Sequence, residues 1–406
     1  MKVGVAFCDH VNSQVAGSLV AQQAMKDGGL TRCDLGLIFY TALHDPEALR
    51  HGVLSVTGES MRLVGVGGVG AITHDRLGYG GSQVGLALFQ LNSVEVDVVS
   101  HGRLCDGEET VGRELGRKMK ALGHCARATP KLLFYDSVDR SSGRFRLNMA
   151  TPLLEGLQKE LGLLSNLAGA GICGDMAGAP GRQIVDHLIT DQQAVALCFS
   201  RAVHMDTVIL HGCQPASGYR TITKSEGPLV LEIDHRPVLE VIGELLAGQD
   251  LAPENYGFFI TLGVNKGDKW GDFEEGAYIN RMCLRADLRR GGLIMFEPDL
   301  VEGTEVQLMH RSLNFDYIAP RVEKAFASLQ GRTPVFALYI DCAGRAGAYS
   351  GTTQEEATEV QRAVAGRVPM LGFYSGVEIA MVMGAPRPLD WTGVFCLFSV
   401  DGSPPS

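Results

Sequence analysis

Three apolar segments rich in glycine constrain this chain more than any other feature of its sequence. The segments are VGVGGVGAI at 64–72, AGAGICGDM at 168–176 and LGFYSGVEI at 371–379. They can be laid over one another without gaps, so that Gly65, Gly169 and Gly372 coincide. Glycine makes up 51 of the 406 residues, and it lets neighbouring backbones approach closely or adopt positive φ. Either three similar strands coincide by chance, or a divergent internal repeat places three strand ends around a shared space.

Each glycine-rich segment belongs to the same local order of elements, which is a first strand, a helix, the glycine-rich strand and a closing strand. The first strands are predicted at 34–40, 131–136 and 334–341, the helices at 45–54, 152–162 and 354–365, the glycine-rich strands at 63–72, 167–175 and 369–377, and the closing strands at 83–91, 193–199 and 393–400. Apolar strands alternating with helical spacing are typical of buried sheets. The sequence therefore predicts an α/β (α+β) fold, with mixed sheets flanked by helices and built from three divergent β-α-β-β units in two domains.

The stretch 204–330 differs from the rest of the chain. It contains short strands separated by turn signals such as Ser225-Glu226-Gly227, at the spacing of all-β structure. A chain of 406 residues also exceeds the usual length of about 100–200 residues for one domain. We therefore predict an N-terminal domain with two β-α-β-β units, a C-terminal domain with the β-rich segment and the third unit, and a short tail. Their ranges are 1–225, 226–400 and 401–406.

The composition excludes several classes of function. Lysine and arginine number 36 against 46 aspartates and glutamates, which gives a net charge of −10 and a pI near 5.6, unlike a basic nucleic-acid-binding protein. No segment has the length and apolarity of a membrane span, and the N-terminal apolar run is too short for a signal peptide. The ten cysteines form no C-x-x-C pair, which favours reduced thiols. We expect a cytoplasmic protein that binds no nucleic acid.

Two matches to the dinucleotide fingerprint G-x-G-x-x-G begin at Gly65 and Gly169. The phosphate-binding version needs a helix that starts at the last glycine, because free N–H groups of that helix hold the pyrophosphate. Neither continuation starts a helix, which favours close strand packing. The 11 histidines show no metal-ligand spacing; His211 beside Gly212-Cys213 is a candidate metal or haem contact, with an ordinary histidine as the simpler interpretation.

Acidic residues follow the predicted strands of the second and third units. Asp136 and Asp341 end the first strands, while Asp175 and Glu378 follow the glycine-rich strands. Ligands of α/β sheets bind beyond the carboxyl ends of the strands, so these acids are candidates for ligand binding. Capping of backbone N–H groups in the following loops explains Asp136 and Asp341 equally well.

Cys342-Ala343-Gly344-Arg345 follows a first strand directly. A neighbouring arginine can stabilise a thiolate and lower the pKa of the cysteine, or hold a carboxylate or phosphate of a ligand. No histidine occurs after His310, so Cys342 has no nearby base in the sequence. This favours ligand binding at Cys342 and Arg345 over catalysis.

Four segments of the chain resemble the FIST sensory domain, a family named after F-box and intracellular signal transduction proteins. They are the first glycine-rich strand; GCQP, TITKSEG and LEIDHRP within 212–237; CAGR at 342–345; and GFYSGVEI at 372–379. The last resembles the C-terminal signature of the family and includes Tyr374. The chain departs from the family at Ala71 and Val377, where Glu and Gly are common, and at Asp390-Trp391-Thr392 after the signature.

The resemblance implies a small-molecule sensor with N-terminal and C-terminal FIST domains, a ligand near their interface, and no F-box. It further implies signalling in trans to a partner such as a histidine kinase, a cyclase or a chemoreceptor. The candidate ligand-binding residues are Asp136, Asp175, Asp341, Cys342, Arg345, Tyr374 and Glu378. Two alternatives stay open: a haem-binding nitric-oxide sensor of the same family, which makes haem a candidate cofactor, and an enzyme that uses Cys342 as its nucleophile.

Overall fold

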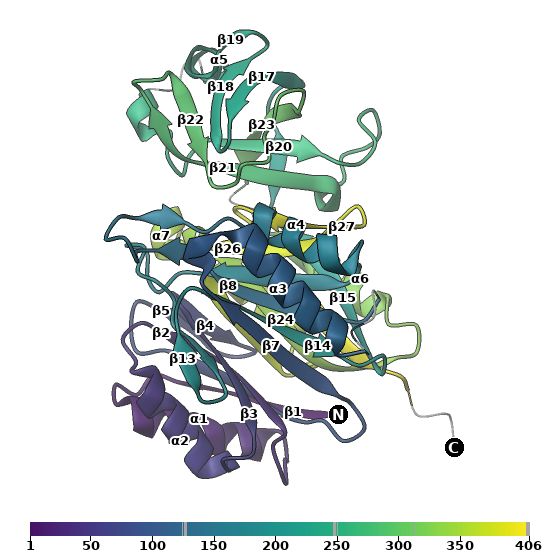
Figure 1. The fold of residues 1–406 in the computed structure, drawn as a ribbon. Coiled ribbons are helices and arrows are strands. Elements are labelled where there is room, and N and C mark those ends of the chain that lie inside the picture. Colours follow the sequence, from purple (N-terminus) through teal and green to yellow (C-terminus); the bar gives the residue numbers. More distant parts are fainter. Residues whose placement is uncertain (124, 126–127, 247–248, 250, 313, 403–406) are drawn as a thin grey trace.

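The computed structural model describes residues 1–402 except 124, 126–127, 247–248, 250 and 313. A body of three six-stranded mixed sheets with flanking helices carries a smaller β-rich lobe (Figure 1). The prediction of a mixed α/β fold is confirmed at this level. No helix in the described part of the chain is long and apolar enough to cross a membrane.

The three sheets of the body have corresponding strand orders. The first is β1 (Lys2–Cys8), β6 (Val84–Gln90), β2 (Leu35–Thr41), β3 (Arg62–Gly68), β12 (Gln183–Val185) and β13 (Leu188–Thr190). The second is β7 (Val96–Gly102), β14 (Gln193–Phe199), β8 (Lys131–Asp136), β11 (Leu167–Ile172), β26 (Val377–Val382) and β27 (Ala385–Leu389). The third is β15 (Val203–Leu210), β28 (Gly393–Val400), β24 (Thr333–Cys342), β25 (Met370–Ser375), β4 (Gly70–Thr73) and β5 (Leu77–Tyr79). In each sheet the two central strands are parallel.

The last two strands of every sheet come from another part of the chain. The hairpin β4–β5, which follows β3, joins the third sheet, β12–β13 joins the first, and β26–β27 joins the second. The prediction of one continuous strand at 63–72 is therefore wrong, and the strand predicted at 369–377 corresponds to β25, which ends at Ser375. The segments 64–72 and 371–379 each form two strands in different sheets, separated by Val69 and by Gly376. This exchange of hairpins links the three sheets into one body.

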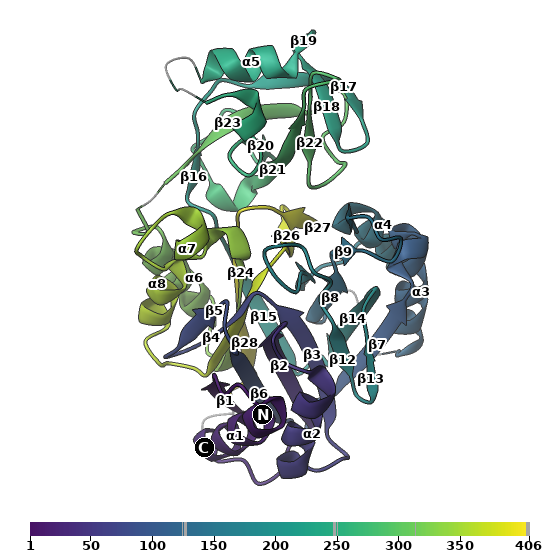
Figure 2. The same ribbon diagram turned by 90° about the vertical axis from the view of Figure 1, so that its left-hand side faces the viewer.

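Pairs of helices cover the outer faces of the sheets (Figure 2). They are α1 (Ser13–Asp27) with α2 (Pro46–Thr57), α3 (Glu108–Ala121) with α4 (Ala150–Leu161), and α6 (Ile318–Ala327) with α8 (Glu356–Val364). Two pairs cross at glycines. A Cβ on Gly17 or on Gly112 would collide with a carbonyl oxygen of the partner helix, so glycine is needed for the helices to approach this closely. The other faces of the sheets meet in the centre of the body, where the rings of Phe39, Phe134 and Phe373 pack at centroid distances of 4.2–5.9 Å.

The lobe is inserted between β15 and α6. It contains β16 (Cys213–Pro215), β17 (Arg220–Glu226), β18 (Leu229–Ile233), β19 (Arg236–Pro237), α5 (Val238–Leu245), β20 (Thr261–Asn265), β21 (Tyr278–Asp287), β22 (Gly292–Met295) and β23 (Glu305–Arg311). Pairing of β23 with β20 closes its sheet. The predicted domain boundary at 225/226 falls inside β17, and the division of the chain into those two domains stays a prediction.

Five short helical elements and one strand pair complete the described part of the chain. They are the 3-10 turns η1 (Leu104–Asp106), η2 (Pro253–Asn255), η3 (Glu275–Ala277) and η4 (Ala343–Arg345), the helix α7 (Gly347–Ser350), and the strand pair β9 (Val138–Asp139) with β10 (Arg146–Leu147). Two of these elements lie directly at strand ends, because η4 follows β24 and β9 follows β8.

Candidate functional site: a cavity between the body and the lobe

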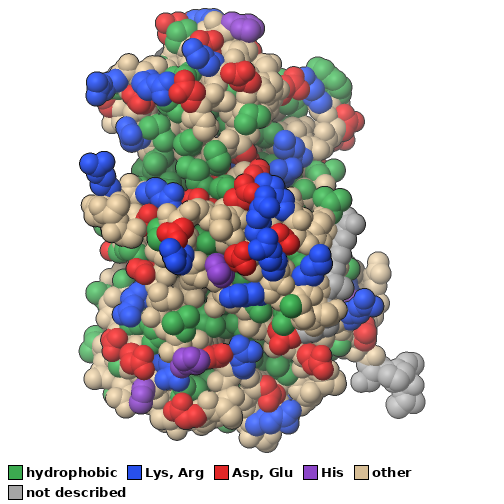
Figure 3. Space-filling model, in the orientation of Figure 1, with side chains coloured by type: hydrophobic (Ala, Val, Ile, Leu, Met, Phe, Trp, Pro, Cys, Tyr) green, Lys and Arg blue, Asp and Glu red, His purple; other side chains and the backbone are tan. Residues whose placement is uncertain are grey.

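A cavity of about 370 Å³ lies where strand ends of the body face the lobe. This volume is within the range of about 300–1,000 Å³ that is usual for small-molecule sites. Hydrophobic side chains gather on the surface at this junction (Figure 3). The body contributes residues after β8, β11, β24 and β25, and the lobe contributes residues of β21 and of the segment after β22. The cavity therefore depends on both parts of the molecule.

Small side chains line the cavity on the side of the body. They are Ser137, Cys173, Cys342, Ala343, Gly344, Ser375 and Gly376. A Cβ on Gly376 would lie 3.1 Å from Ser137 Oγ and 3.3 Å from Cys173 Sγ, so the strand ends meet with no room for a larger residue. The strand ends thus pack closely against one another, and the cavity lies beside their small side chains.

Aromatic side chains form the opposite wall and the mouth. Phe258 and Phe296 of the lobe pack edge to face, with ring centroids 5.7 Å apart. Phe145 in the β9–β10 hairpin is 47% exposed and Met176 is also exposed at the cavity. Phe258 has a φ of 60°, a strained conformation for an aromatic residue. Exposed apolar groups around a cavity indicate a surface that binds a ligand or another protein.

Glu297 is the buried acid of the cavity wall. It follows β22 in the lobe, and only 1% of its surface is exposed. Its two carboxylate oxygens accept hydrogen bonds from the backbone N–H groups of Ala150 (2.8 Å) and Thr151 (2.9 Å). These are the first residues of α4, a helix with no N-cap side chain of its own. A carboxylate of the lobe thus caps a helix of the body. Burial raises the pKa of Glu297 to about 7.

Two of the predicted site residues, Asp175 and Cys342, line the cavity. Asp175 is exposed at the mouth, where its Oδ1 accepts hydrogen bonds from the N–H groups of Ala177 and Ala179, both at 2.9 Å. Cys342 is buried, and burial together with nearby Glu378 raises the pKa of its thiol well above the ordinary value. Arg345 opposes this shift only weakly. The sulfur therefore stays a thiol near neutral pH, which disfavours a role as nucleophile.

We expect iodoacetamide to modify exposed Cys105 at least about tenfold faster than Cys342 at pH 7.5, because the thiolate reacts and burial suppresses it. Mass spectrometry of the alkylated protein measures both rates. In urea the two rates should become similar. Preferential labelling of Cys342 in the folded protein would contradict the structure and support the nucleophile hypothesis.

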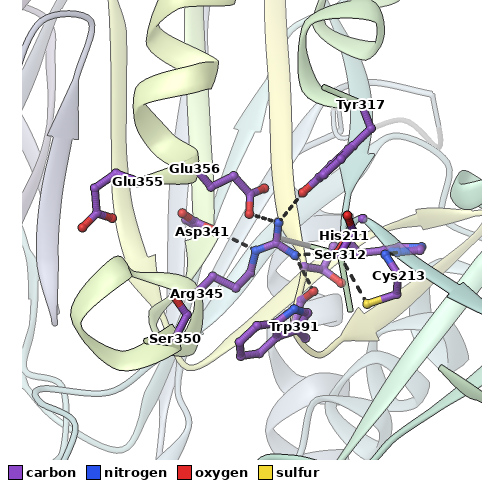
Figure 4. A network of polar contacts seen from close by, with 12 residues as sticks. His211, Cys213, Ser312, Tyr317, Asp341, Arg345, Ser350, Glu355, Glu356 and Trp391 are labelled. Atoms are coloured by element: carbon purple, nitrogen blue, oxygen red, sulfur yellow. Dashed lines mark hydrogen bonds and ion pairs between the residues drawn. The ribbon is translucent and has the colours of Figure 1, made fainter. Parts of the chain in front are cut away.

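Arg345 and Asp341 lie in a buried polar network beside the cavity (Figure 4). The guanidinium forms ion pairs with Glu356 of α8 and, at 3.4 Å, with Asp341. It also donates to Tyr317 Oη (2.8 Å) and to the carbonyl oxygens of His211 (3.1 Å) and Trp391 (2.7 Å). Arg345 thus joins β24 and α8 to the segment that leads into the lobe, and its donors are engaged within the protein.

Asp136 is enclosed by its own loops. Its oxygens accept hydrogen bonds from the N–H groups of Val138, Gly181 and Gln192 and from the Gln192 side chain, at 3.0–3.3 Å. Burial nevertheless raises the pKa of Asp136 to about 7. These contacts match the capping interpretation for Asp136, whereas Asp341 faces Arg345 instead. Asp136 does not line the cavity.

Tyr374 and Glu378 lie behind the wall of the cavity. Glu378 accepts a hydrogen bond from Ser375 Oγ at 2.7 Å, and Ser375 lines the cavity. Tyr374 packs in the core next to the helices, with its ring 5.3 Å from that of Tyr79. Neither residue lines the cavity itself, so Glu378 reaches it through Ser375.

The pairing register corrects the prediction that Asp136 and Asp341 stand at equivalent ends of their strands. Gly169 pairs with Leu133, and Gly372 pairs with Tyr339. Counting three residues onward from those partners gives Asp136 in β8 but Cys342 in β24, so Cys342 rather than Asp341 corresponds to Asp136. Successive side chains of a strand point to opposite faces. Asp341 therefore faces Arg345 on the helix side, while Cys342 lines the cavity.

The cavity lining and the surroundings of His211 do not fit a haem held by histidine. Within the described residues no histidine lines the cavity. Both ring nitrogens of buried His211 are engaged, Nδ1 with the Cys213 N–H (2.9 Å) and Nε2 with the Glu275 carbonyl (3.1 Å). Burial lowers the pKa of His211 to about 3, so the ring is neutral. The part of the chain that the structure describes also holds no group of three His, Cys, Asp or Glu side chains suited to a metal ion.

The fold and the cavity define a mixed α/β protein whose body and β-rich lobe enclose a pocket at their junction. A FIST N domain matches residues 34–236 and a FIST C domain matches residues 239–381. The chain therefore belongs to the FIST family, as the four sequence segments predicted. FIST domains are associated with signal transduction.

Similar proteins add little about activity. An uncharacterized protein of Mycobacterium tuberculosis is 26% identical over 199 residues, which cover 48% of this chain and 51% of the relative. An uncharacterized protein of Mycobacterium bovis is 26% identical over 198 residues, covering 48% and 50%. The chain spans about half the length of these curated relatives. A crystal structure of cyanuric acid hydrolase from A. caulinodans aligns over 99% of this chain and 100% of that chain, with a TM-score of 0.37 and 9% identity.

Proposed function

We propose that this protein is a small-molecule sensor of the FIST family and that its ligand occupies the cavity between body and lobe. The observation that carries the proposal is that both parts line one cavity of small-molecule size. A ligand that touches both parts favours the arrangement in which they are close, because binding shifts a conformational equilibrium toward the state with more contacts.

Polar contacts already connect the two parts around the cavity. Asp390 of the body accepts a hydrogen bond from the Met282 N–H of the lobe at 2.9 Å, and Arg281 of the lobe donates to the Pro388 carbonyl at 2.9 Å. Glu297 adds its two bonds to α4. Met282 and Glu297 line the cavity, so a ligand there lies next to two of these connections and can strengthen or strain them. We propose that the resulting change is transmitted in trans to a signalling partner such as a histidine kinase, a cyclase or a chemoreceptor.

Two further features of the proposal come from the cysteines. Each of the ten, all within the described residues, is present as a thiol, which supports a reducing, cytoplasmic environment. The protonated, buried Cys342 supports ligand binding over catalysis. We therefore propose a binding protein and assign no catalytic residue.

A blocked cavity tests the proposal. Ala177 is exposed and lines the cavity mouth, so Ala177→Trp fills space there without disturbing the core. In a thermal-shift screen of small molecules, compounds that stabilise the wild type should lose at least about tenfold in affinity, roughly 1.4 kcal/mol, with this variant. Leu188→Trp, on the exposed edge strand β13, is the matched control and should bind like the wild type. Hits that are indifferent to Ala177→Trp, or a broad library without any hit, would refute the proposal.

A further inference from the structure

The charged groups at the cavity differ in burial and in how many of their polar atoms are already hydrogen-bonded within the protein. Arg140 donates through Nε and one terminal nitrogen to the Gly178 (2.8 Å) and Ala177 (3.0 Å) carbonyls and lies over the Phe145 ring at 5.4 Å. Its guanidinium therefore holds the loop at the mouth. Asp175 caps the same loop with Oδ1 and is exposed to water. Within the described residues, Arg140 is the only lysine or arginine of the lining.

Glu297 has the opposite character. It is almost fully buried at the cavity wall, and each carboxylate oxygen accepts a single backbone N–H. A carboxylate oxygen has two acceptor positions, so acceptor capacity is left for a donor in the cavity. Arg281 acts on Glu297 but is ion-paired with Asp299 at 2.6 Å, and Arg140 is directed to the loop carbonyls at the mouth. A ligand anion placed against Glu297 would therefore be repelled by its carboxylate, whereas a ligand cation or N–H donor there would be stabilised by it.

The rest of the lining sets the shape of the ligand. Hydrophobic and aromatic side chains dominate it, namely Val138, Phe145, Leu147, Met176, Phe258, Met282, Leu284, Phe296 and Val377. Three phenylalanines suit the faces and edges of a flat ring. They are also suited to a cation beside a ring. The lining therefore combines apolar walls with one buried hydrogen-bond acceptor, the carboxylate of Glu297.

We propose that the cavity binds a molecule with an aromatic body and a primary amine, in which the ammonium group donates to Glu297 and the ring packs among Phe145, Phe258 and Phe296. This rests on the proposed function, because it names the ligand class of the same cavity. The ammonium group forms a charge-assisted hydrogen bond with Glu297. The chemistry disfavours aromatic carboxylates of the same size.

Three probes with one ring and different end groups test the ligand class by calorimetry on the full chain at pH 8. They are 2-phenylethylamine, 2-phenylethanol and 3-phenylpropionate. We expect the amine to bind at least tenfold more tightly than the alcohol, and the carboxylate to bind most weakly. Glu297→Gln should weaken the amine at least tenfold and change alcohol binding less than threefold, because only the amine uses the charge. Asp175→Asn, the matched control at the exposed acid, should preserve the preference for the amine.

A second variant keeps the test decisive if Glu297→Gln lowers stability through its lost helix cap. Phe145 is half exposed, so Phe145→Ala should fold normally and weaken the amine about fivefold. If the carboxylate or the alcohol binds best, if no probe binds, or if Glu297→Gln leaves amine affinity unchanged, the amine class is wrong. Ala177→Trp separates this result from the proposed function. If this variant fails to bind ligands of another class that bind the wild type, the cavity is still the binding site and only the amine class is wrong. If the variant binds them as the wild type does, the cavity is not the binding site.

Discussion

Replacing Arg345 by methionine should lower the free energy of unfolding by about 3–5 kcal/mol, because it leaves two buried carboxylates without their counter-charge. Asp341 and Glu356 both lie against this guanidinium in the core. Burial already raises the pKa of Asp341 and of Glu356 above the usual range. Without the arginine, both must be protonated or hydrated for the protein to fold. Urea denaturation followed by circular dichroism measures the loss.

Two further variants make this result specific. Arg362→Met removes an arginine whose side chain is 68% exposed and whose partner is Glu359, so it should cost less than about 1 kcal/mol. Adding Glu356→Gln to Arg345→Met should recover part of the stability, because it removes one stranded charge. If Arg345→Met is as stable as the wild type, the guanidinium is not needed by the fold, and a ligand-binding role for Arg345 becomes the better explanation.

Gly169→Ala should destabilise the protein by about 3 kcal/mol, the upper end of the usual cost of overpacking. A Cβ at this position would collide with the carbonyl oxygen of Leu133 in the neighbouring strand β8. A main-chain atom in the centre of a sheet cannot turn aside as a side chain can, so β8 and β11 must move apart. Elsewhere in a strand the same change favours folding, because alanine loses less conformational freedom than glycine.

Gly218→Ala is the matched control. Gly218 is exposed, and a Cβ there would meet no atom within 4 Å. We expect its effect on stability to lie within about 0.5 kcal/mol, as measured by thermal and urea unfolding side by side with Gly169→Ala. Equal effects of the two substitutions would show that close backbone approach is not the reason for glycine at 169.

The strand ends illustrate which parts of the site could be predicted. Asp175 and Cys342 were found because polar residues after buried strands tend to face ligands, and both line the cavity. The same rule applies to Glu297, which follows the apolar residues 293–296, and could have selected it. The sequence does not single it out because 204–330 has the pattern of a separate β-rich segment. Nothing in the local sequence marks Phe258, whose place at the cavity depends on how the lobe sits on the body.

The remaining predicted residues show a different limitation. The sequence predicts Arg345 and Asp136 as ligand-binding groups, but the structure surrounds each with partners from the protein itself. Sequence spacing shows that Glu356 follows Arg345 by eleven positions, but not that α8 packs its first turn against η4. Whether a charged residue meets solvent, ligand or another residue depends on contacts between distant segments.

The sequence by itself determined the α/β class, the FIST family and the three glycine-rich segments, because these depend on local periodicity and on motifs that are contiguous along the chain. Only the tertiary structure decided that two of those segments each divide between two sheets, that Cys342 rather than Asp341 corresponds to Asp136, and that the lobe completes the cavity. The physical reason is that strand pairing and register are set by non-local hydrogen bonds, and a shift of one residue moves every side chain to the other face of the sheet. The glycines permit close approach, and the fold decides which strands come together there.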